Sequence, residues 1–394
     1  MATFTATKGN NNNTQNSYFV TTLRTARAIM VATLFSLLLN LTSCSPDSVN
    51  PDSVTETAYT ASTRATAVID SNSTLKSVAT FPIGATPGSW ITKKAKGYEV
   101  FKTQFDSKTV HAYMSIETSQ GVFNFQELDF WAKWAETNPV RLHGHCLVFH
   151  TGAPEWMLQF KGNTSDFELM IKKHIQTIVG RQKGKIQGWD VFNEIFTSQG
   201  KIDQTPFRKL YTSDEAYLTF VKQCFKWAHE ADPNALLFYN DFSMENSQAK
   251  LDAVVSMVED FKKSGIPING VGSQMHININ TSDAGIRNSL LKLTATGLLI
   301  HISELDIAVN PTNDANLIIN QQLLDTQRAK YKAVVVAYKQ LVPTRLQYGI
   351  TLWDFSDADS WIVAQKKKND APCIFDGSYN KKPAFYGLMD GAIN

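Results

Sequence analysis

The sequence has no strong excess of charge of either sign. Its 394 residues include 38 Lys and Arg against 36 Asp and Glu, which gives a formal net charge of +2 at pH 7. Proteins that bind nucleic acids usually present an extended basic surface, and this balance is too even to provide one. The only dense basic run, at residues 366–368, is interpreted as a solvated loop. We therefore expect no nucleic-acid partner.

Cysteine is also scarce, with four in the chain, at positions 44, 146, 224 and 373. The last three cannot all pair with one another, so at least one of them is expected to be a free thiol. No CxxC motif occurs and no His/Cys pair has the spacing of metal ligands, so we predict no metal site. The glycine-rich motifs that hold nucleotide phosphates are absent as well.

One apolar run, residues 28–41, suggests a targeting segment. It is shorter than the roughly 20 residues of a membrane span. It follows two arginines and ends in LTSC at residues 41–44, which resembles the lipobox of bacterial lipoproteins. We predict a lipoprotein signal peptide at residues 1–43, with an ordinary signal peptide and a chance cysteine as the alternative. A lipidated Cys44 would bind membrane lipid and hold the protein at the bacterial cell envelope, facing the periplasm or the cell exterior.

Residues 44–80 are predicted to form a disordered tether that begins at the lipidated cysteine. Fourteen of the 36 residues from 45 to 80 are Ser or Thr, and the sequence PDSV occurs twice. Large apolar residues are nearly absent, so the segment is not expected to bury enough surface to fold. The folded domain is expected at residues 81–394.

From residue 81 onward, short apolar runs alternate with segments of helical period. The runs, interpreted as strands, are residues 81–85, 109–114, 140–149, 186–192, 235–240, 268–276, 298–305 and 348–353. Residues 213–231, 246–264 and 316–341 are interpreted as helices, the first with Ser213 as its N-cap. Eight such repeats are typical of a single α/β domain, a (β/α)8 TIM barrel with parallel strands. A doubly wound open sheet is the alternative.

Polar side chains gather at the ends of six successive predicted strands. In chain order they are His143, His145 and His150; Asn193 and Glu194; Asn240 and Asp241; Gln274 and His276; His301, Glu304 and Asp306; and Trp353, Asp354, Asp357, Asp359 and Trp361. The active site of such a barrel lies where the strands end, so these groups are expected to converge at one rim. One of them alone could be a buried, hydrogen-bonded group or a helix cap, but six sets favour a functional site.

Two glutamates define the chemistry expected at this rim. If Glu194 and Glu304 close the fourth and seventh strands, they face each other across the barrel mouth. Paired carboxylates cleave glycosidic bonds, because one protonates the leaving oxygen while the other stabilises or attacks the anomeric carbon. The acid needs a raised pKa, which burial near another carboxylate supplies. The nucleophile must stay ionised, which nearby hydrogen-bond donors favour.

The sequence around these residues resembles glycoside hydrolase family 10, the endo-1,4-β-xylanases, from about residue 81 to the C-terminus. The similar segments occur in the family's order: FDSKT, GVFNF, HGHCLVFH, WDVFNE, ADPNALLFYND, GVGSQMHI, ISELDI, SDADSW and IFDGSYNKKPAF. One segment alone would be a moderate indication, and the set at these spacings is a strong one.

The resemblance implies a role for each matching residue. Glu194 would be the general acid/base, with Asn193 beside it hydrogen-bonding the sugar 2-hydroxyl. Glu304 would be the nucleophile, His276 would orient it, and Asp306 would support His276.

The resemblance also implies how the sugar is held. His145 and Gln274 would contact the sugar at the cleavage point, and Trp353 and Trp361 would form walls and a lid over it. The family works with retention through a covalent glycosyl-enzyme and uses no cofactor.

The sequence departs from the family's pattern at three places. The family's ENxMKW segment, whose Glu, Asn and Lys grip the next sugar on the non-reducing side, is HAYMSI here, with His111, Ala112 and Ser115 in those positions. Phe149 replaces a Trp, and Ile362 replaces an Arg. Loss of charge-assisted contacts weakens the expected grip on a xylose unit.

We therefore expect a monomeric retaining endo-β-1,4-glycosidase that binds a β-1,4-linked polysaccharide or oligosaccharide and hydrolyses xylan. Two alternatives stay open. One is the same chemistry on another β-linked plant or algal polysaccharide. The other is a surface lipoprotein that binds glycans without cutting them.

Overall fold

The computed structural model of the protein describes residues 73–393. The predicted signal peptide at residues 1–43, Cys44 and most of the predicted tether lie outside the described residues. Within residues 73–393, no helix combines the length and the apolar character needed to cross a membrane.

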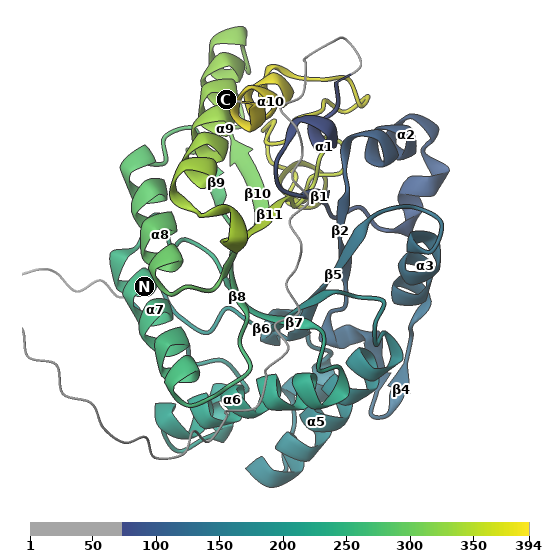
Figure 1. The fold of residues 1–394 in the computed structure, drawn as a ribbon, viewed down its shortest axis with the longest axis vertical. Helices are drawn as coiled ribbons and strands as arrows, with labels where there is room; N and C mark the ends of the chain where they lie inside the picture. Colours follow the sequence, from purple (N-terminus) through teal and green to yellow (C-terminus); the bar gives the residue numbers. More distant parts are fainter. Residues whose placement is uncertain (1–72, 394) are drawn as a thin grey trace, which may run out of the picture. The chain divides into compact units, whose positions relative to one another are not determined.

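Eight parallel strands close into a barrel (Figure 1). Around the barrel they are β1 (Ile83–Ala85), β2 (Ser107–His111), β5 (Arg141–Val148), β6 (Gly188–Asn193), β7 (Leu236–Asp241), β8 (Gly270–Ser273), β10 (Leu299–Ala308) and β11 (Gln347–Leu352). Closure is made by β11, in which Ile350 is aligned with Ile302 of β10 on one side and with Ile83 of β1 on the other. The predicted (β/α)8 TIM barrel is confirmed, because an open sheet would leave these edges unpaired.

Each of the eight predicted runs overlaps one of these strands, but the sixth is divided. Strand β8 ends at Ser273, and a separate strand β9 (His276–Asn278) pairs with the far end of β10, where His276 is aligned with Asp306. Met275 lies between them with φ 53°, a left-handed conformation that turns the chain. A two-stranded antiparallel sheet of β3 (Glu117–Ser119) and β4 (Val122–Phe123) lies in the segment after β2 and was not predicted.

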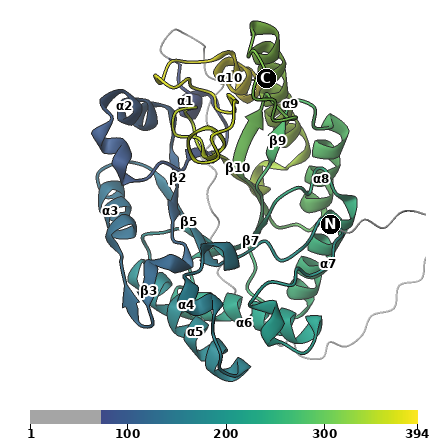
Figure 2. The same cartoon turned by 180° about the vertical axis from the view of Figure 1, so that it is seen from behind.

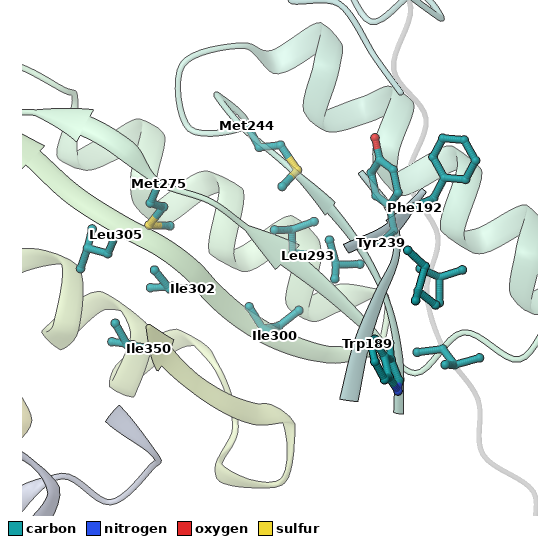
Figure 3. Packing of buried hydrophobic residues seen from close by; sticks show 14 of the residues in the cluster. Trp189, Phe192, Tyr239, Met244, Met275, Leu293, Ile300, Ile302, Leu305 and Ile350 are labelled. Carbon is teal, nitrogen blue, oxygen red and sulfur yellow. The ribbon is translucent and has the colours of Figure 1, made fainter. Parts of the chain in front are cut away.

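The strands are buried because helices cover the outside of the barrel and side chains fill its inside. All six residues of β6 are buried. The Trp189 ring of this strand lies over Gly144 of β5, where a Cβ atom would come within 2.2 Å of the indole, so only glycine leaves room for it. Figure 3 shows the packing of Trp189, together with Ile300 and Ile302 of β10 and Ile350 of β11.

Helices surround the strands in both views of the molecule (Figures 1 and 2). They are α1 (Leu75–Val78), α2 (Ala95–Gln104), α3 (Gln126–Ala135), α4 (Glu155–Leu158), α5 (Thr164–Arg181), α6 (Asp214–Ala231), α7 (Gln248–Lys263), α8 (Asp283–Ala295), α9 (Gln321–Leu341) and α10 (Pro383–Ile393).

The three helices predicted from amphipathic period are present as α6, α7 and α9. Ser213 is the N-cap of α6, as predicted, and its Oγ accepts a hydrogen bond from the Ala216 amide at 3.1 Å. Helix α9 lies within the segment 316–341 that was expected to contain it, and its start is set by Asn320, the N-cap, which accepts from the Leu323 amide.

The predicted boundary between tether and domain, at residue 80, is wrong. Residues 75–78 form α1, which packs near α2 and α10, and Leu75 and Ala79 are fully buried. The Leu75 amide donates to the Gln104 side chain at 3.1 Å. A single turn rich in Ser and Lys has too few apolar residues to be recognised by composition, and it is stabilised by the core it packs against.

Candidate active site

The carboxyl ends of β6, β7, β8 and β10 bring the two predicted glutamates into one cluster. Glu194 follows β6 with φ 57°, a left-handed conformation that is uncommon for a residue other than glycine. Such conformations concentrate at functional sites, where the surrounding structure enforces them. Here the left-handed conformation of Glu194 lets the consecutive side chains of Asn193 and Glu194 both point into the cluster at the strand ends.

Glu304 lies within β10, and a bulge aims its side chain. The register with β11 moves by three residues on β10, from Ile302 to Leu305, but by two on β11, from Ile350 to Leu352. In a regular strand, Ser303 and Glu304 would point to opposite faces. Here both contact Asn240 of β7, which donates to Glu304 Oε1 at 2.7 Å and accepts from Ser303 Oγ at 2.6 Å. Bulges commonly serve this purpose beside active sites.

Two buried amides connect the glutamates. Asn193 Nδ2 donates to Glu194 Oε1 at 3.2 Å. The Asn193 Oδ1 atom accepts from Asn240 Nδ2 at 2.9 Å, and that amide group also donates to Glu304. Gln274 completes the cluster by donating to Glu194 Oε1 at 3.0 Å. The carboxylates are thus held by a shared set of rigid donors.

The surroundings of Glu194 suit a proton donor at neutral pH. Burial raises the pKa of Glu194, the nearby carboxylates of Asp241 and Glu304 raise it further, and the Gln274 hydrogen bond offsets part of the rise, which leaves the pKa at about 7. A carboxyl group with this pKa carries a proton in a large fraction of molecules near pH 7, and it can return to the charged form after donating it.

The surroundings of Glu304 differ, because positive charge lies against it. Glu304 Oε2 is 3.1 Å from His276 Nε2, and His276 Nδ1 is 2.9 Å from Asp306 Oδ2. Burial alone would lower the pKa of His276, but the carboxylates of Asp306 and Glu304 raise it to about 10. His276 is therefore an imidazolium at neutral pH and donates to both carboxylates. A carboxylate with a donor on each oxygen has the environment that a nucleophile needs.

Indole rings border this cluster. Trp361 Nε1 donates to Asp306 Oδ2 at 2.7 Å, and its ring lies 4.9 Å from the His276 ring. Trp353 lies 5.2 Å from the His145 ring and 6.2 Å from the His276 ring. Both indoles are half-buried, so part of each ring is available for contact with a sugar.

His145 is held in the same region by Asp190, a buried carboxylate that was not predicted from the sequence. Its Nδ1 lies 2.8 Å from Asp190 Oδ2 and 3.9 Å from Glu304 Oε1. Asp190 also lies 3.1 Å from His143 Nε2. Burial would raise the pKa of Asp190, but the two histidines hold it well below its usual value. An acidic residue inside the apolar run WDVF is the feature that could have revealed it, because a buried carboxylate needs partners.

The structure brings together all the residues to which the resemblance assigned a role in the site: Asn193, Glu194, His145, Gln274, His276, Glu304, Asp306, Trp353 and Trp361. Several other polar strand-end residues have structural partners instead. His301 Nε2 lies 2.8 Å from Thr351 Oγ1 inside the barrel. Asp357 pairs with Lys382, and Asp359 pairs with Lys94. Asn240, one of the predicted strand-end residues, belongs to the site through its contact with Glu304, and Ser303, which was not predicted, joins the site through its contact with Asn240.

The segment that departs from the family pattern is also well placed. His111 ends β2 and is aligned with His145 in the neighbouring strand. Ala112 is fully buried and Ser115 is exposed. Residues 73–393 contain no group of three or more His, Cys, Asp or Glu side chains arranged to hold a metal ion.

Comparison with known proteins agrees with this geometry. The family model "Glycosyl hydrolase family 10" matches residues 73–391. The chain is 35% identical over 322 residues to the endo-beta-1,4-xylanase Xyn10C of Cellvibrio japonicus, covering 75% of this chain and 52% of that protein. It is 30% identical to an endo-1,4-beta-xylanase of Agaricus bisporus, covering 70% of this chain and 79% of the fungal protein.

Solved structures give the same result. Native xylanase 10C of Cellvibrio japonicus superimposes with a TM-score of 0.76 at 33% identity, covering 86% of this chain and 75% of that one. The family-10 structure from Paenibacillus barcinonensis gives a TM-score of 0.75 at 27% identity, covering 80% of this chain and 96% of that one. The chain spans only about half the length of the Cellvibrio proteins whose sequences it matches. With the family model covering almost all of the described residues, the chain belongs to glycosyl hydrolase family 10.

Proposed function

We propose that this protein is a retaining endo-β-1,4-xylanase. The observation that carries the proposal is that two carboxyl groups, linked through hydrogen-bonded amides, have different surroundings. Glu194 is buried with a pKa of about 7, and Glu304 lies against the imidazolium of His276. One group is suited to donating a proton and the other to attacking carbon, which is the equipment of a glycosidase.

In the first step Glu304 attacks the anomeric carbon of a bound xylose unit. The glycosidic C–O bond breaks, and Glu194 gives its proton to the departing sugar oxygen. The product is an ester between the sugar and Glu304. In the second step Glu194, now a carboxylate, takes a proton from water as the water oxygen attacks the same carbon. The ester breaks, Glu304 is restored, and two inversions leave the original configuration.

The remaining site residues hold the sugar and the nucleophile. Asn193 is placed to hydrogen-bond the 2-hydroxyl, a contact that tightens in the transition state and, together with distortion of the sugar ring, contributes several kcal/mol. His145 and Gln274 contact the same sugar, and Trp353 and Trp361 enclose it. His276, fixed by Asp306, keeps the Glu304 oxygen aimed at the anomeric carbon.

We propose xylan as the substrate because the relatives are named as xylanases. One of them, xylanase 10C from Cellvibrio japonicus, was solved in complex with xylopentaose and is 32% identical to this chain. One observation favours the same reaction on another β-linked polysaccharide: His111, Ala112 and Ser115 replace the charged grip of the family. A glycan-binding lipoprotein without activity is less favoured, since it would not need two glutamates held in this way.

A reducing-sugar assay on purified polysaccharides tests the proposal. Wild-type protein should release reducing ends from xylan, and Glu304→Ala should not, while still binding the polymer. Binding by wild-type protein with no release of reducing ends would contradict the enzymatic function. Release from a different β-linked polysaccharide, with xylan untouched, would keep the reaction and change the substrate.

We also propose that the chain is anchored through a lipid on Cys44 at the bacterial cell envelope. Support comes from the lipobox-like sequence LTSC after an apolar run of suitable length. A two-chain lipid anchor is strong enough to hold a protein stably on a membrane surface.

A further inference from the structure

A cavity of about 600 Å³ lies beside the candidate active site and has no part in the reaction described above. Its walls include Trp90 and Lys93, which follow β1; His111, at the end of β2; Asp354, which follows β11; and Gln365. Its volume falls in the range of small-ligand sites.

The position of the cavity is set by the barrel. Strand β6, which Glu194 follows, is four strands away from β11 in either direction around the ring, so the cavity opens on the side of the mouth opposite the proton donor. The donor faces the departing part of the substrate, and the cavity therefore faces the part that the enzyme retains. His111 lies next to His145 in the strand register, and Trp353 is about equally close to both rings, 5.2 Å from each.

One residue of the cavity wall, His111, has a side-chain nitrogen without a hydrogen-bond partner among the described residues. His111 Nε2 is buried and has no hydrogen-bond partner among residues 73–393. Burial and the nearby Lys108 and His145 lower the pKa of His111 to about 3, so the ring is neutral. A buried polar atom without a partner costs free energy, which a hydroxyl of a bound sugar would recover. Trp90 is 41% exposed at the cavity wall; Lys94 Nζ lies 4.6 Å from its ring centre, and the exposed part of the indole offers apolar surface to a sugar ring.

The rim of the cavity carries unpaired positive charge. Within the described part of the chain, Lys93 forms no ion pair, and Lys367 and Lys368 are exposed without one in the loop that follows wall residue Gln365. The acidic groups are fewer. Asp359 is neutralised by Lys94 at 2.5 Å, and burial raises the pKa of Asp354 to about 7. His111 is neutral where the family has a glutamate, so this position places no negative charge in the cavity.

On the basis of the proposed function, we infer that this cavity receives an acidic sugar side group, a uronic acid attached to the xylan backbone. The geometry assigns the carboxylate to Lys93, Lys367 and Lys368, and a ring hydroxyl to His111 Nε2. The decorated xylose is the second unit from the cut on the retained side, because His145 contacts the first and His111 lies one strand further out. The run at residues 366–368, interpreted from sequence as a solvated loop, thereby acquires a binding role.

The test compares two oligosaccharides of the same shape and different charge. One is a xylo-oligosaccharide with a glucuronic acid branch, and the other is the same compound with its carboxyl group reduced to an alcohol. Binding is measured by calorimetry with the Glu304→Ala protein, and kcat/KM with wild type. We expect a preference for the acidic compound of roughly tenfold, the size of one charge-assisted hydrogen bond. Lys93→Gln should reduce this ratio several-fold, and Lys96→Gln, a neighbouring exposed lysine outside the cavity, should leave it unchanged.

Each outcome is decisive. Equal binding and equal cleavage of the two compounds would overturn the inference and leave the xylanase proposal intact. If neither compound nor the undecorated oligosaccharide binds, both proposals fail. Product sizing gives a second measurement: the branch should remain on the second xylose from the new reducing end, and products that never carry a branch there would overturn the inference.

Discussion

The pKa of Glu194 should rise when the Gln274 side chain no longer donates to it. Gln274 Nε2 lies 3.0 Å from Glu194 Oε1, and this hydrogen bond favours the charged form of the carboxylate. Gln274→Met keeps the length of the side chain and removes the donor. Glu194 must be protonated to act as the acid, so activity falls as pH rises through its pKa of about 7. The variant should therefore stay active to higher pH than wild type.

The size of the shift follows from the strength of the lost bond. A hydrogen bond to a charged group contributes about 1.5–3 kcal/mol, and one pKa unit corresponds to about 1.36 kcal/mol. Removing the donor alone could therefore raise the pKa by one to two units, on the order of 100-fold in the ionisation constant at most. Asn193 Nδ2 remains 3.2 Å from the same oxygen and continues to stabilise the charge. We therefore expect a shift of about one unit.

The measurement is the pH dependence of kcat/KM on a soluble xylo-oligosaccharide, which reports the pKa values of the free enzyme. Gln274→Met also loses a sugar contact and should lower kcat/KM at every pH, but this does not move the position of the basic limb. Trp353→Phe is the matched control, because it weakens sugar binding without touching Glu194. A basic limb that stays in place or moves to lower pH in Gln274→Met would refute the reasoning, and so would an equal shift in the control.

Three further changes test other parts of the site and the chain. Glu304→Gly should lose turnover and recover it with azide, giving a glycosyl azide of inverted configuration; a product of retained configuration would mean that the roles of the glutamates are exchanged. Asp306→Asn removes one partner of the buried His276 imidazolium and should cost about 3 kcal/mol of unfolding free energy at pH 7. The raised pKa of His276 contributes stability that is complete below its usual value of 6.5 and is lost as pH rises through about 10. The melting temperature of wild type should therefore fall across this range more than that of Asp306→Asn, and parallel curves would argue against a charged His276. Cys44→Ala should move the protein from the membrane fraction to the soluble fraction, and a variant that stays with the membranes would exclude the lipid anchor.

The barrel was predictable because its strands are short, apolar and regularly spaced. Where the period changes, prediction was less accurate. The run 268–276 was read as one strand, although Gln274 and Met275 interrupt it and turn the chain into β9. The boundary at residue 80 failed for a related reason. Helix α1 has only Leu75 and Val78 to bury, and its stability comes from the surface it packs on, which local composition does not reveal.

The two glutamates of the candidate site could be predicted from the sequence, because a carboxylate at the end of an apolar strand is costly to bury without partners and therefore indicates a function. Among the supporting groups of the site, Asn240 was expected at the rim because it ends a predicted strand, whereas Ser303 and Asp190 were not predicted. Ser303 reaches the site through a bulge in β10, and Asp190 reaches it from inside β6. A bulge moves a side chain to the other face of a strand, and the alternation of apolar and polar residues along the sequence does not show where a bulge occurs. Asp357 shows the opposite error, since it lies near the strand ends but serves an ion pair with Lys382.

The coupling between Glu194 and Glu304 explains how one residue can serve as acid and then as base. The negative charge of Glu304 is one of the causes that raise the pKa of Glu194 in the free enzyme. When Glu304 becomes an ester, that charge disappears, and the pKa of Glu194 falls at the moment when it must accept a proton from water. The Gln274 and Asn193 donors remain in place and favour the carboxylate that results. The amide network therefore needs no rearrangement between the two steps, because the charge of the nucleophile itself sets which form of Glu194 is favoured.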